Sequence, residues 1–260
     1  MKKGKIIRSI LLIIFAGIFV FSGYKIVSQL LEEKQAEDLY SDFQNIAITS
    51  ETETVSSENK EETNTEPEKN ENKLNLKINF DALNKKSKDI VGWIYSPDTP
   101  INYPVVKGKD NEQYIRHLPN GKYNYAGSIF ADYRNKENNN DSNYIIYGHN
   151  MKNDTMFGTL TEYYNQKYYD KHPIIYLLTP EKNYEIQLYS GYVAPADSYA
   201  YTINRTEEET KKYMNKISRE STFKSNVKYT PGDRTVTLST CTNVSDEERY
   251  VLVGILKEIK

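Results

Sequence analysis

The longest hydrophobic pattern in the chain is an unbroken apolar run from Ile10 to Phe21. A helix over residues 9–27 would be about 28 Å long, close to the roughly 30 Å hydrocarbon core of a bilayer. Basic side chains precede the run: Lys2, Lys3, Lys5 and Arg8. We therefore predict that residues 1–30 form a cytoplasmic tip and a single-pass membrane anchor, with the rest of the chain outside the cell.

A cleaved signal peptide is the alternative interpretation of this segment. The residues after Phe21, Ser-Gly-Tyr-Lys-Ile-Val-Ser-Gln, lack a clear small-x-small cleavage site, and the segment has no cysteine for lipid attachment. The pattern favours the uncleaved anchor.

Two segments of different character follow the anchor. In residues 31–49, Leu39, Phe43 and Ile46 recur at helical spacing among polar residues, which predicts a juxtamembrane amphipathic helix. Residues 50–73 are acidic, contain no aromatic residue and have too few apolar side chains to offset the entropy of ordering. We expect a disordered, self-repelling linker there, in preference to an acidic binding tail.

From residue 74 onward the pattern changes to short β-branched and aromatic runs separated by Pro, Gly, Asn and Asp. The predicted strands are residues 91–95, 101–106, 128–130, 144–147, 174–179, 184–193, 235–240 and 250–259. Strands at this spacing indicate a mainly β domain over residues 74–260, either a closed barrel or a sandwich.

Short helical segments interrupt the strand series. Phe80, Leu83 and Ile90 predict a first helix, capped by Asn79 or Asp81. Apolar and aromatic side chains between Phe157 and Tyr164 predict a second one. A third is expected over residues 206–219, because its first turn is acidic.

Charge and composition exclude several function classes. The net charge of −2 hides a basic N-terminus and an acidic linker; the remainder is nearly balanced and has no block of Lys and Arg, so no nucleic acid partner is expected. One cysteine permits no internal disulfide, and the three histidines are scattered. We expect no metal and no cofactor.

The single cysteine, Cys241, ends one predicted strand, and Arg249 begins the next. If the two strands are adjacent, a thiol and a guanidinium lie at the same end of them. A lone cysteine is commonly a small buried hydrophobic residue, which is the alternative. His149 also follows a predicted strand, and Gly148 before it is expected to allow a sharp turn.

These three residue types suit nucleophilic catalysis. Cys241 would be the nucleophile, His149 the proton donor and acceptor, and Arg249 the group aimed at a developing oxyanion. His117 and His172 lie in turn-like contexts and are expected to be structural.

The sequence resembles the sortases, and class B in particular. The motifs that carry the resemblance are Thr237-Leu-Ser-Thr-Cys241, Arg249, Tyr147-Gly-His149, Val91-Gly-Trp-Ile-Tyr95, Ile101-Asn-Tyr-Pro-Val-Val106, Asp110-Asn111 with Ile115, and Gly127-Ser-Ile-Phe-Ala-Asp-Tyr-Arg-Asn135. The resemblance implies an eight-stranded closed β-barrel and a cysteine transpeptidase of the Gram-positive cell wall. The loop after Cys241 carries no family motif, so Arg249 is assigned because it is the only arginine after Arg234.

The resemblance also implies a mechanism and partners. The thiolate would attack the threonine carbonyl of a C-terminal sorting signal on a surface protein, and a peptidoglycan precursor amine would resolve the thioacyl enzyme. Signals of the Asn-Pro-x-Thr-Asn or Pro-x-Thr-Gly kind are expected. Implied substrate contacts are Asn111, Ile115, Tyr199, Tyr201, Ile203 and Ser239, with the backbone N–H of Thr242 as an oxyanion donor. From ordinary pKa values near 8.5 for Cys and 6.5 for His, we predict that the neutral pair dominates at pH 7.

Other functions stay open at this point. A sortase that polymerises pilins would use the same site. An L,D-transpeptidase would have His and Gly immediately before the cysteine, and a papain-like enzyme would have its cysteine before its histidine; neither pattern is present. A non-catalytic anchored binding domain with a buried thiol is the remaining alternative.

Overall fold

The computed structural model describes residues 2–48, 76–136, 141–242, 244–245 and 247–259. The chain divides into two compact units, residues 1–41 and 42–260. The predicted linker, residues 50–73, lies outside the described residues.

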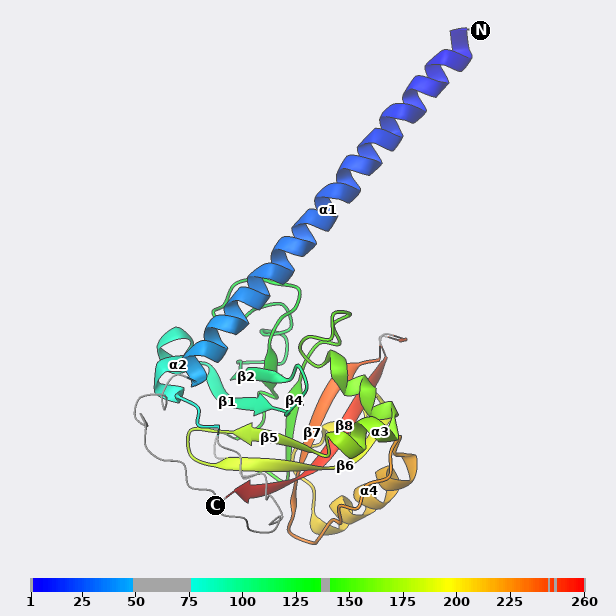
Figure 1. Ribbon diagram of the computed structural model, residues 1–260. Coiled ribbons are helices and arrows are strands. Elements are labelled where there is room, and N and C mark those ends of the chain that lie inside the picture. Colours follow the sequence, from blue (N-terminus) through cyan, green and yellow to red (C-terminus); the bar gives the residue numbers. More distant parts are fainter. Residues whose placement is uncertain (1, 49–75, 137–140, 243, 246, 260) are drawn as a thin grey trace, which may run out of the picture. The chain divides into compact units, whose positions relative to one another are not determined.

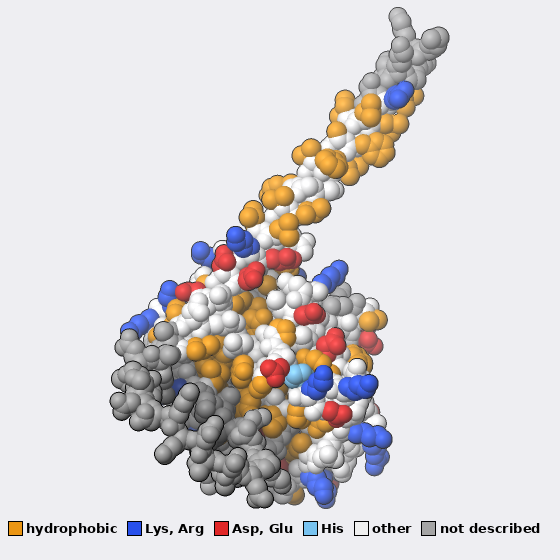
Figure 2. All heavy atoms as spheres, in the orientation of Figure 1, with side chains coloured by type: hydrophobic (Ala, Val, Ile, Leu, Met, Phe, Trp, Pro, Cys, Tyr) orange, Lys and Arg blue, Asp and Glu red, His pale blue; other side chains and the backbone are white. Residues whose placement is uncertain are grey.

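One continuous helix, α1 (Lys2–Ile48), forms the first unit and continues a few residues into the second. The apolar run lies on it with its large side chains exposed, and Figure 2 shows them as a long hydrophobic stretch. Among the described residues this is the one helix long and apolar enough to cross a membrane, a test that a signal sequence also passes. The predicted amphipathic segment is the last part of the same helix.

The last residues of α1 belong to the second unit. Phe43 and Ala47 are buried, and the Gln44 side chain donates a hydrogen bond of 2.8 Å to the carbonyl of Asn102. The compact unit begins at Asp42, whereas the sequence pattern predicts a catalytic domain that begins at residue 74. The boundary at residue 74 stays a prediction.

The second unit is a closed eight-stranded barrel (Figure 1). Its strands are β1 (Ile90–Tyr95), β2 (Asn102–Lys107), β3 (Ile129–Ala131), β4 (Asn143–Tyr147), β5 (Ile174–Leu178), β6 (Asn183–Pro195), β7 (Arg234–Cys241) and β8 (Glu248–Ile259). Neighbours follow the order β1-β2-β3-β4-β7-β8-β6-β5. The pairs β2/β3 and β4/β7 are parallel, and the others are antiparallel. All eight predicted strands are confirmed, and the barrel replaces the sandwich alternative.

The helices are α2 (Phe80–Lys86), α3 (Gln166–Lys171) and α4 (Glu207–Glu220), with the 3-10 turns η1 (Gly158–Tyr164) and η2 (Tyr199–Tyr201). Asn79 caps α2 as predicted, but Ile90 starts β1 instead of belonging to that helix. The segment expected to be an ordinary helix at 157–164 is the 3-10 turn η1. Both α3 and η2 were missed, because each is too short to show a helical period.

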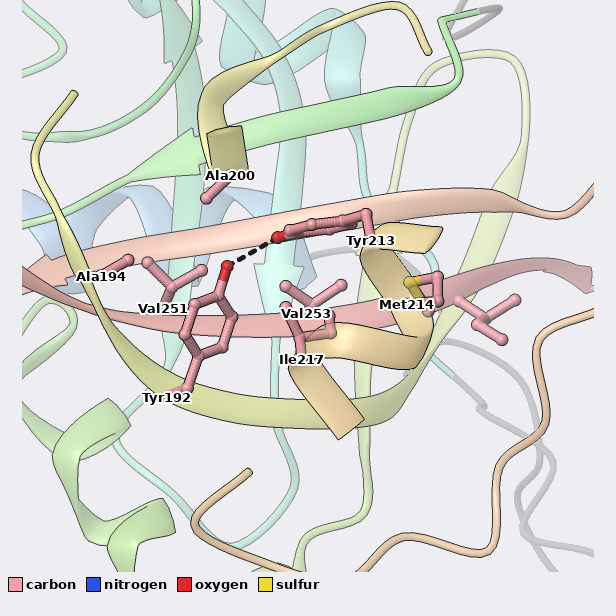
Figure 3. Packing of buried hydrophobic residues seen from close by; sticks show 9 residues of the cluster. Tyr192, Ala194, Ala200, Tyr213, Met214, Ile217, Val251 and Val253 are labelled. Atoms are coloured by element: carbon pink, nitrogen blue, oxygen red, sulfur yellow. Dashed lines mark hydrogen bonds between the residues drawn. The ribbon is translucent and has the colours of Figure 1, made fainter. Parts of the chain in front are cut away.

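The α4 helix begins with a complete capping box, in which Thr206 and Glu209 satisfy each other's backbone N–H groups. Its apolar face packs on the outside of the barrel against β6 and β8 (Figure 3). The hydroxyls of Tyr192 and Tyr213 lie 2.8 Å apart in this contact, so both phenols keep a partner when buried. This packing fixes the segment between β6 and α4, which includes η2.

Candidate active site

The barrel brings Cys241 and Arg249 together at one end. In the antiparallel β7/β8 pair, Cys241 lies directly opposite Arg249, at the last residue pair before the connecting loop. The expectation that the two lie at the same end of adjacent strands is confirmed. Residues opposite each other in such a pair have Cβ atoms about 5 Å apart, so both side chains serve one site.

His149 reaches the same end through a parallel pair. In β4/β7, Tyr147 lies opposite Ser239, so continuing the register by two residues places His149 beside Cys241. Gly148 does not adopt a left-handed backbone there; instead, a Cβ at this position would come within 2.4 Å of the Ile129 side chain and 2.8 Å of the Phe157 ring. The expectation of a glycine-dependent sharp turn is therefore wrong, and the glycine is needed for close packing.

The three residues line one cleft of about 340 Å³. Its lining is Asn111, Ile115, Phe130, Tyr147, Gly148, His149, Ala196, Tyr201, Ser239, Thr240, Cys241 and Arg249. Cys241 is half-buried and is not paired in a disulfide. A thiol on a cleft wall beside an imidazole and a guanidinium can act on a bound carbonyl.

The structure separates the predicted substrate contacts into two groups. Asn111, Ile115, Tyr201 and Ser239 line the cleft, whereas Tyr199, Ile203 and Thr242 are not among its lining residues. Ile203 is buried, and its carbonyl accepts a hydrogen bond from the backbone N–H of Asn143. Tyr199 lines a neighbouring groove of about 480 Å³ between β6 and α4.

That groove is larger than the cleft, but its chemistry differs. Its described lining contains tyrosine, aliphatic, Lys and Glu side chains and no cysteine or histidine. The reactive groups are gathered in the smaller cleft, which makes the cleft the candidate active site.

The imidazole of His149 is held by the backbone. Its Nε2 lies 2.7 Å from the carbonyl oxygen of Ile115. Because a carbonyl can only accept, Nε2 carries the proton and the neutral ring has its lone pair on Nδ1. Burial lowers the pKa of His149, and the positive charges of Arg116 and Arg249 lower it further, against the opposing effect of the Ile115 carbonyl. The neutral form therefore dominates at pH 7.

Tyr201 lines the same cleft and contacts Ser239. Its hydroxyl lies 2.9 Å from Ser239 Oγ. Burial raises the pKa of Tyr201 to about 12, with the charge of Arg249 acting against the rise and that of Cys241 adding to it. The phenol is thus a neutral hydrogen-bonding group on the cleft wall at working pH.

A buried carboxylate, Asp132, holds the part of the cleft wall that Asn111 and Tyr147 form. It accepts hydrogen bonds from Arg134 Nη2 at 2.7 Å, Asn111 Nδ2 at 3.0 Å and the Tyr147 hydroxyl at 2.9 Å. Burial alone would raise the pKa of Asp132, but these hydrogen bonds outweigh it and hold the pKa below its usual value. Arg134 Nη2 also donates to the carbonyl of Tyr201 at 3.1 Å, which joins this wall to η2.

Sequence reasoning assigned no role to Asp132, Arg134 or Tyr147, although each stands in a quoted motif. The available signal was an acidic residue directly after the buried strand β3. Among the described residues, no group of three His, Cys, Asp or Glu side chains could hold a metal ion.

Comparisons with known proteins identify the family of this fold. A family model described as a sortase domain matches residues 94–257. Sortase B of Listeria monocytogenes is 35% identical over 260 residues, which covers 98% of this chain and 99% of that protein.

Solved structures match as well. Sortase B from Bacillus anthracis in complex with AAEK1 superposes with a TM-score of 0.72 at 31% identity, covering 88% of this chain and 100% of that one. A Staphylococcus aureus sortase B–substrate complex superposes with a TM-score of 0.66 at 34% identity, covering 70% of this chain and 85% of that one. With a family model over most of the barrel and a full-length relative above 30% identity, the chain belongs to the sortase family of cysteine transpeptidases, as a member of class B.

Proposed function

We propose that the protein is a membrane-anchored transpeptidase that cuts the C-terminal sorting signal of a surface protein after threonine and joins that protein to a peptidoglycan amine. The observation that carries the proposal is the in-register pair of Cys241 and Arg249 beside His149 in one cleft. The Staphylococcus aureus relative described as a substrate complex supports a peptide-binding role for this cleft.

In the first half-reaction the Cys241 thiolate forms a bond to the threonine carbonyl carbon, and the carbonyl electron pair moves to oxygen. Arg249 and the backbone N–H of Thr242 stabilise that oxyanion. When it collapses, the carbon–nitrogen bond breaks, and the leaving amine takes a proton from His149. The product is a thioacyl enzyme.

In the second half-reaction an acceptor amine attacks the thioester. Neutral His149 removes a proton from the amine, and the Cys241 thiolate leaves. The lowered pKa of His149 makes the imidazolium the minority form of this ring at pH 7. The imidazolium is nevertheless the form that the first step requires, because it gives its proton to the leaving amine.

Four side chains on the cleft wall are proposed as substrate contacts: Asn111, Ile115, Tyr201 and Ser239. Ile115 offers a partly exposed apolar surface, and its carbonyl holds His149, so one residue touches both the substrate and the base. The proposal leaves out the side chains of Tyr199, Ile203 and Thr242, because none of them lines this cleft. Thr242 is kept for its backbone N–H alone, because that group directly follows Cys241.

The test is incubation of the full-length protein in detergent micelles with peptides carrying Asn-Pro-x-Thr-Asn and Pro-x-Thr-Gly signals. We expect one class to be cleaved after threonine and a thioacyl adduct on Cys241 to appear by mass spectrometry. Cys241→Ala, His149→Ala and Arg249→Ala should each lower kcat/KM by roughly 10³-fold or more. Cleavage by Cys241→Ala at the wild-type rate would overturn the proposal.

The acceptor is tested in the same assay. A glycine-type peptidoglycan amine and a lysine side-chain amine from a pilin are offered in competition. We expect transfer to the peptidoglycan amine. Exclusive transfer to lysine would identify a pilus-building enzyme instead.

Localisation has a separate test. We expect the protein to fractionate with the membrane, with the barrel accessible to protease added outside protoplasts, because the exposed apolar side chains of α1 favour a bilayer. Release of a soluble barrel into the medium would show that the segment is a signal peptide.

A further inference from the structure

Asn150, the residue after the candidate base, contacts the backbone of the candidate nucleophile. Its side-chain Nδ2 lies 2.7 Å from the carbonyl oxygen of Cys241. Only the amide nitrogen of Asn can donate to a carbonyl, so the direction of this hydrogen bond is determined by chemistry.

The contact extends a strand ladder beyond the end of β4. In the β4/β7 pair, the N–H of Gly148 donates to the carbonyl of Ser239 at 3.1 Å. The next acceptor along that edge of a parallel ladder is two residues further, which is the carbonyl of Cys241. The Asn150 side chain supplies the donor there, in place of the backbone N–H that a longer strand would supply.

This hydrogen bond determines more than the position of one carbonyl. The peptide unit between Cys241 and Thr242 is planar and trans, so its N–H points away from its C=O. Fixing the carbonyl on the β4 side therefore fixes the direction of the Thr242 N–H on the other side. That N–H is the proposed oxyanion donor, and it lies just after the last residue of β7.

We propose that Asn150 is a positioning residue that orients the Thr242 N–H toward the developing oxyanion. The amide also polarises the peptide unit, because a hydrogen bond to its carbonyl makes its N–H a stronger donor. The proposal rests on the proposed acyl-transfer chemistry of Cys241, but it does not depend on which sorting peptide is used.

A purely structural role for Asn150 predicts a different outcome. Another hydrogen bond, from Thr240 Oγ1 to the carbonyl of Gly148 at 2.8 Å, already joins the two segments. If Asn150 only joined them, its loss would lower stability and the reactivity of Cys241 in general. If it orients the oxyanion donor, its loss slows reactions that pass through an oxyanion and no others.

The experiment compares two reactions of Cys241 in the full-length protein. Acetylation by p-nitrophenyl acetate passes through a tetrahedral oxyanion, whereas disulfide formation with methyl methanethiosulfonate does not. In Asn150→Ala we expect the ratio of the acetylation rate to the thiosulfonate rate to fall about tenfold, below the hundredfold or more for complete loss of an oxyanion donor. Peptide cleavage by this variant should show a lower kcat with KM unchanged.

The matched control is Asn153→Ala, in the same loop. Asn153 accepts hydrogen bonds from Thr155 and does not line the cleft, so its loss should leave the ratio at the wild-type value. Asn150→Leu, which has a similar size and no donor, gives the same measurement if the alanine variant does not fold.

The outcomes are distinct. A ratio of the two rates that stays at the wild-type value overturns the role of Asn150, whether both rates are unchanged or both fall together. Failure of the wild type to cleave any sorting peptide affects the proposed function alone, because the ratio is measured without a peptide.

Discussion

Two buried charges are connected to the same 3-10 turn, η2: Asp132 through Arg134, and Arg205 directly. On the cleft side, Asp132 is fully buried and Arg134 links it to the carbonyl of Tyr201. On the groove side, Arg205 is 7% exposed and donates to the carbonyls of Tyr199 and Ala200. The turn thus has one end in the active-site cleft and the other in the neighbouring groove.

The partners of the two charges differ in kind. Asp132 has a counter-ion and hydroxyl and amide donors, so its charge is compensated. Within the described part of the chain, Nε and Nη1 of Arg205 have no hydrogen-bond partner, and its guanidinium carbon lies 4.1 Å from the centroid of the Tyr213 ring. Removing one partner of a compensated buried charge lowers stability strongly. Replacing a poorly compensated buried charge with an apolar group lowers stability little.

The largest expected effect follows from removing the compensated charge. In Asp132→Ala, the Tyr147 hydroxyl and the Asn111 amide lose a buried acceptor, so we expect the free energy of unfolding to fall by about 3 kcal/mol. Arg134 is partly exposed and can turn to water, which limits the loss. Urea denaturation measures the change, and Asp132→Asn, which keeps the shape and one acceptor, should lose less. Equal losses in both variants would show that the charge is unimportant.

A smaller effect is expected from removing the Tyr201 hydroxyl, which joins η2 to β7. Tyr201→Phe leaves the buried Ser239 Oγ without this partner, at a cost of about 1 kcal/mol. Because both side chains line the cleft, KM for the sorting peptide should rise while kcat changes little. Tyr199→Phe is the control on the groove side and should leave KM unchanged; a rise in KM there would break the distinction between cleft and groove.

Replacing the poorly compensated charge should change stability least. Arg205→Met removes the desolvation penalty together with two hydrogen bonds and the ring contacts, so we expect unfolding free energy within about 1 kcal/mol of wild type. Thermal denaturation at fixed pH measures it. A loss as large as that of Asp132→Ala would mean that the tyrosine rings and carbonyls compensate Arg205 as well as a counter-ion compensates Asp132.

The last prediction concerns pH and the cleft alone. Arg116 lowers the pKa of His149, so Arg116→Gln should raise that pKa, as measured by NMR titration of the ring. The pKa of His149 is lower in the folded state than in the unfolded state. His149 therefore has no effect on stability above about pH 6.5, where it is neutral in both states. Below about pH 6.5 the unfolded state takes up the proton more readily, so stability falls as pH falls. The variant should lose less stability over that range. An unchanged pKa would place Arg116 outside the electrostatic environment of His149.

Much of the fold could be predicted because its signals are local. The eight strands follow from alternating or β-branched runs bounded by turn residues, and α4 follows from its capping box and amphipathic face. The 3-10 character of η1, the short α3 and the place of Ile90 in β1 could not be predicted. Short helices have little period of their own, so packing against the barrel decides them.

The sequence by itself determined that Cys241 and Arg249 share one end of the barrel, because a strand, a short loop and a strand return to the same edge. It also placed His149 at a strand end and, through its motifs, indicated the family. Only the tertiary structure decided that Asn150 contacts Cys241, which is 91 positions away, and that Asp132 organises the cleft. Such contacts depend on the register of parallel strands joined by long connections, and no local pattern of residues encodes that register.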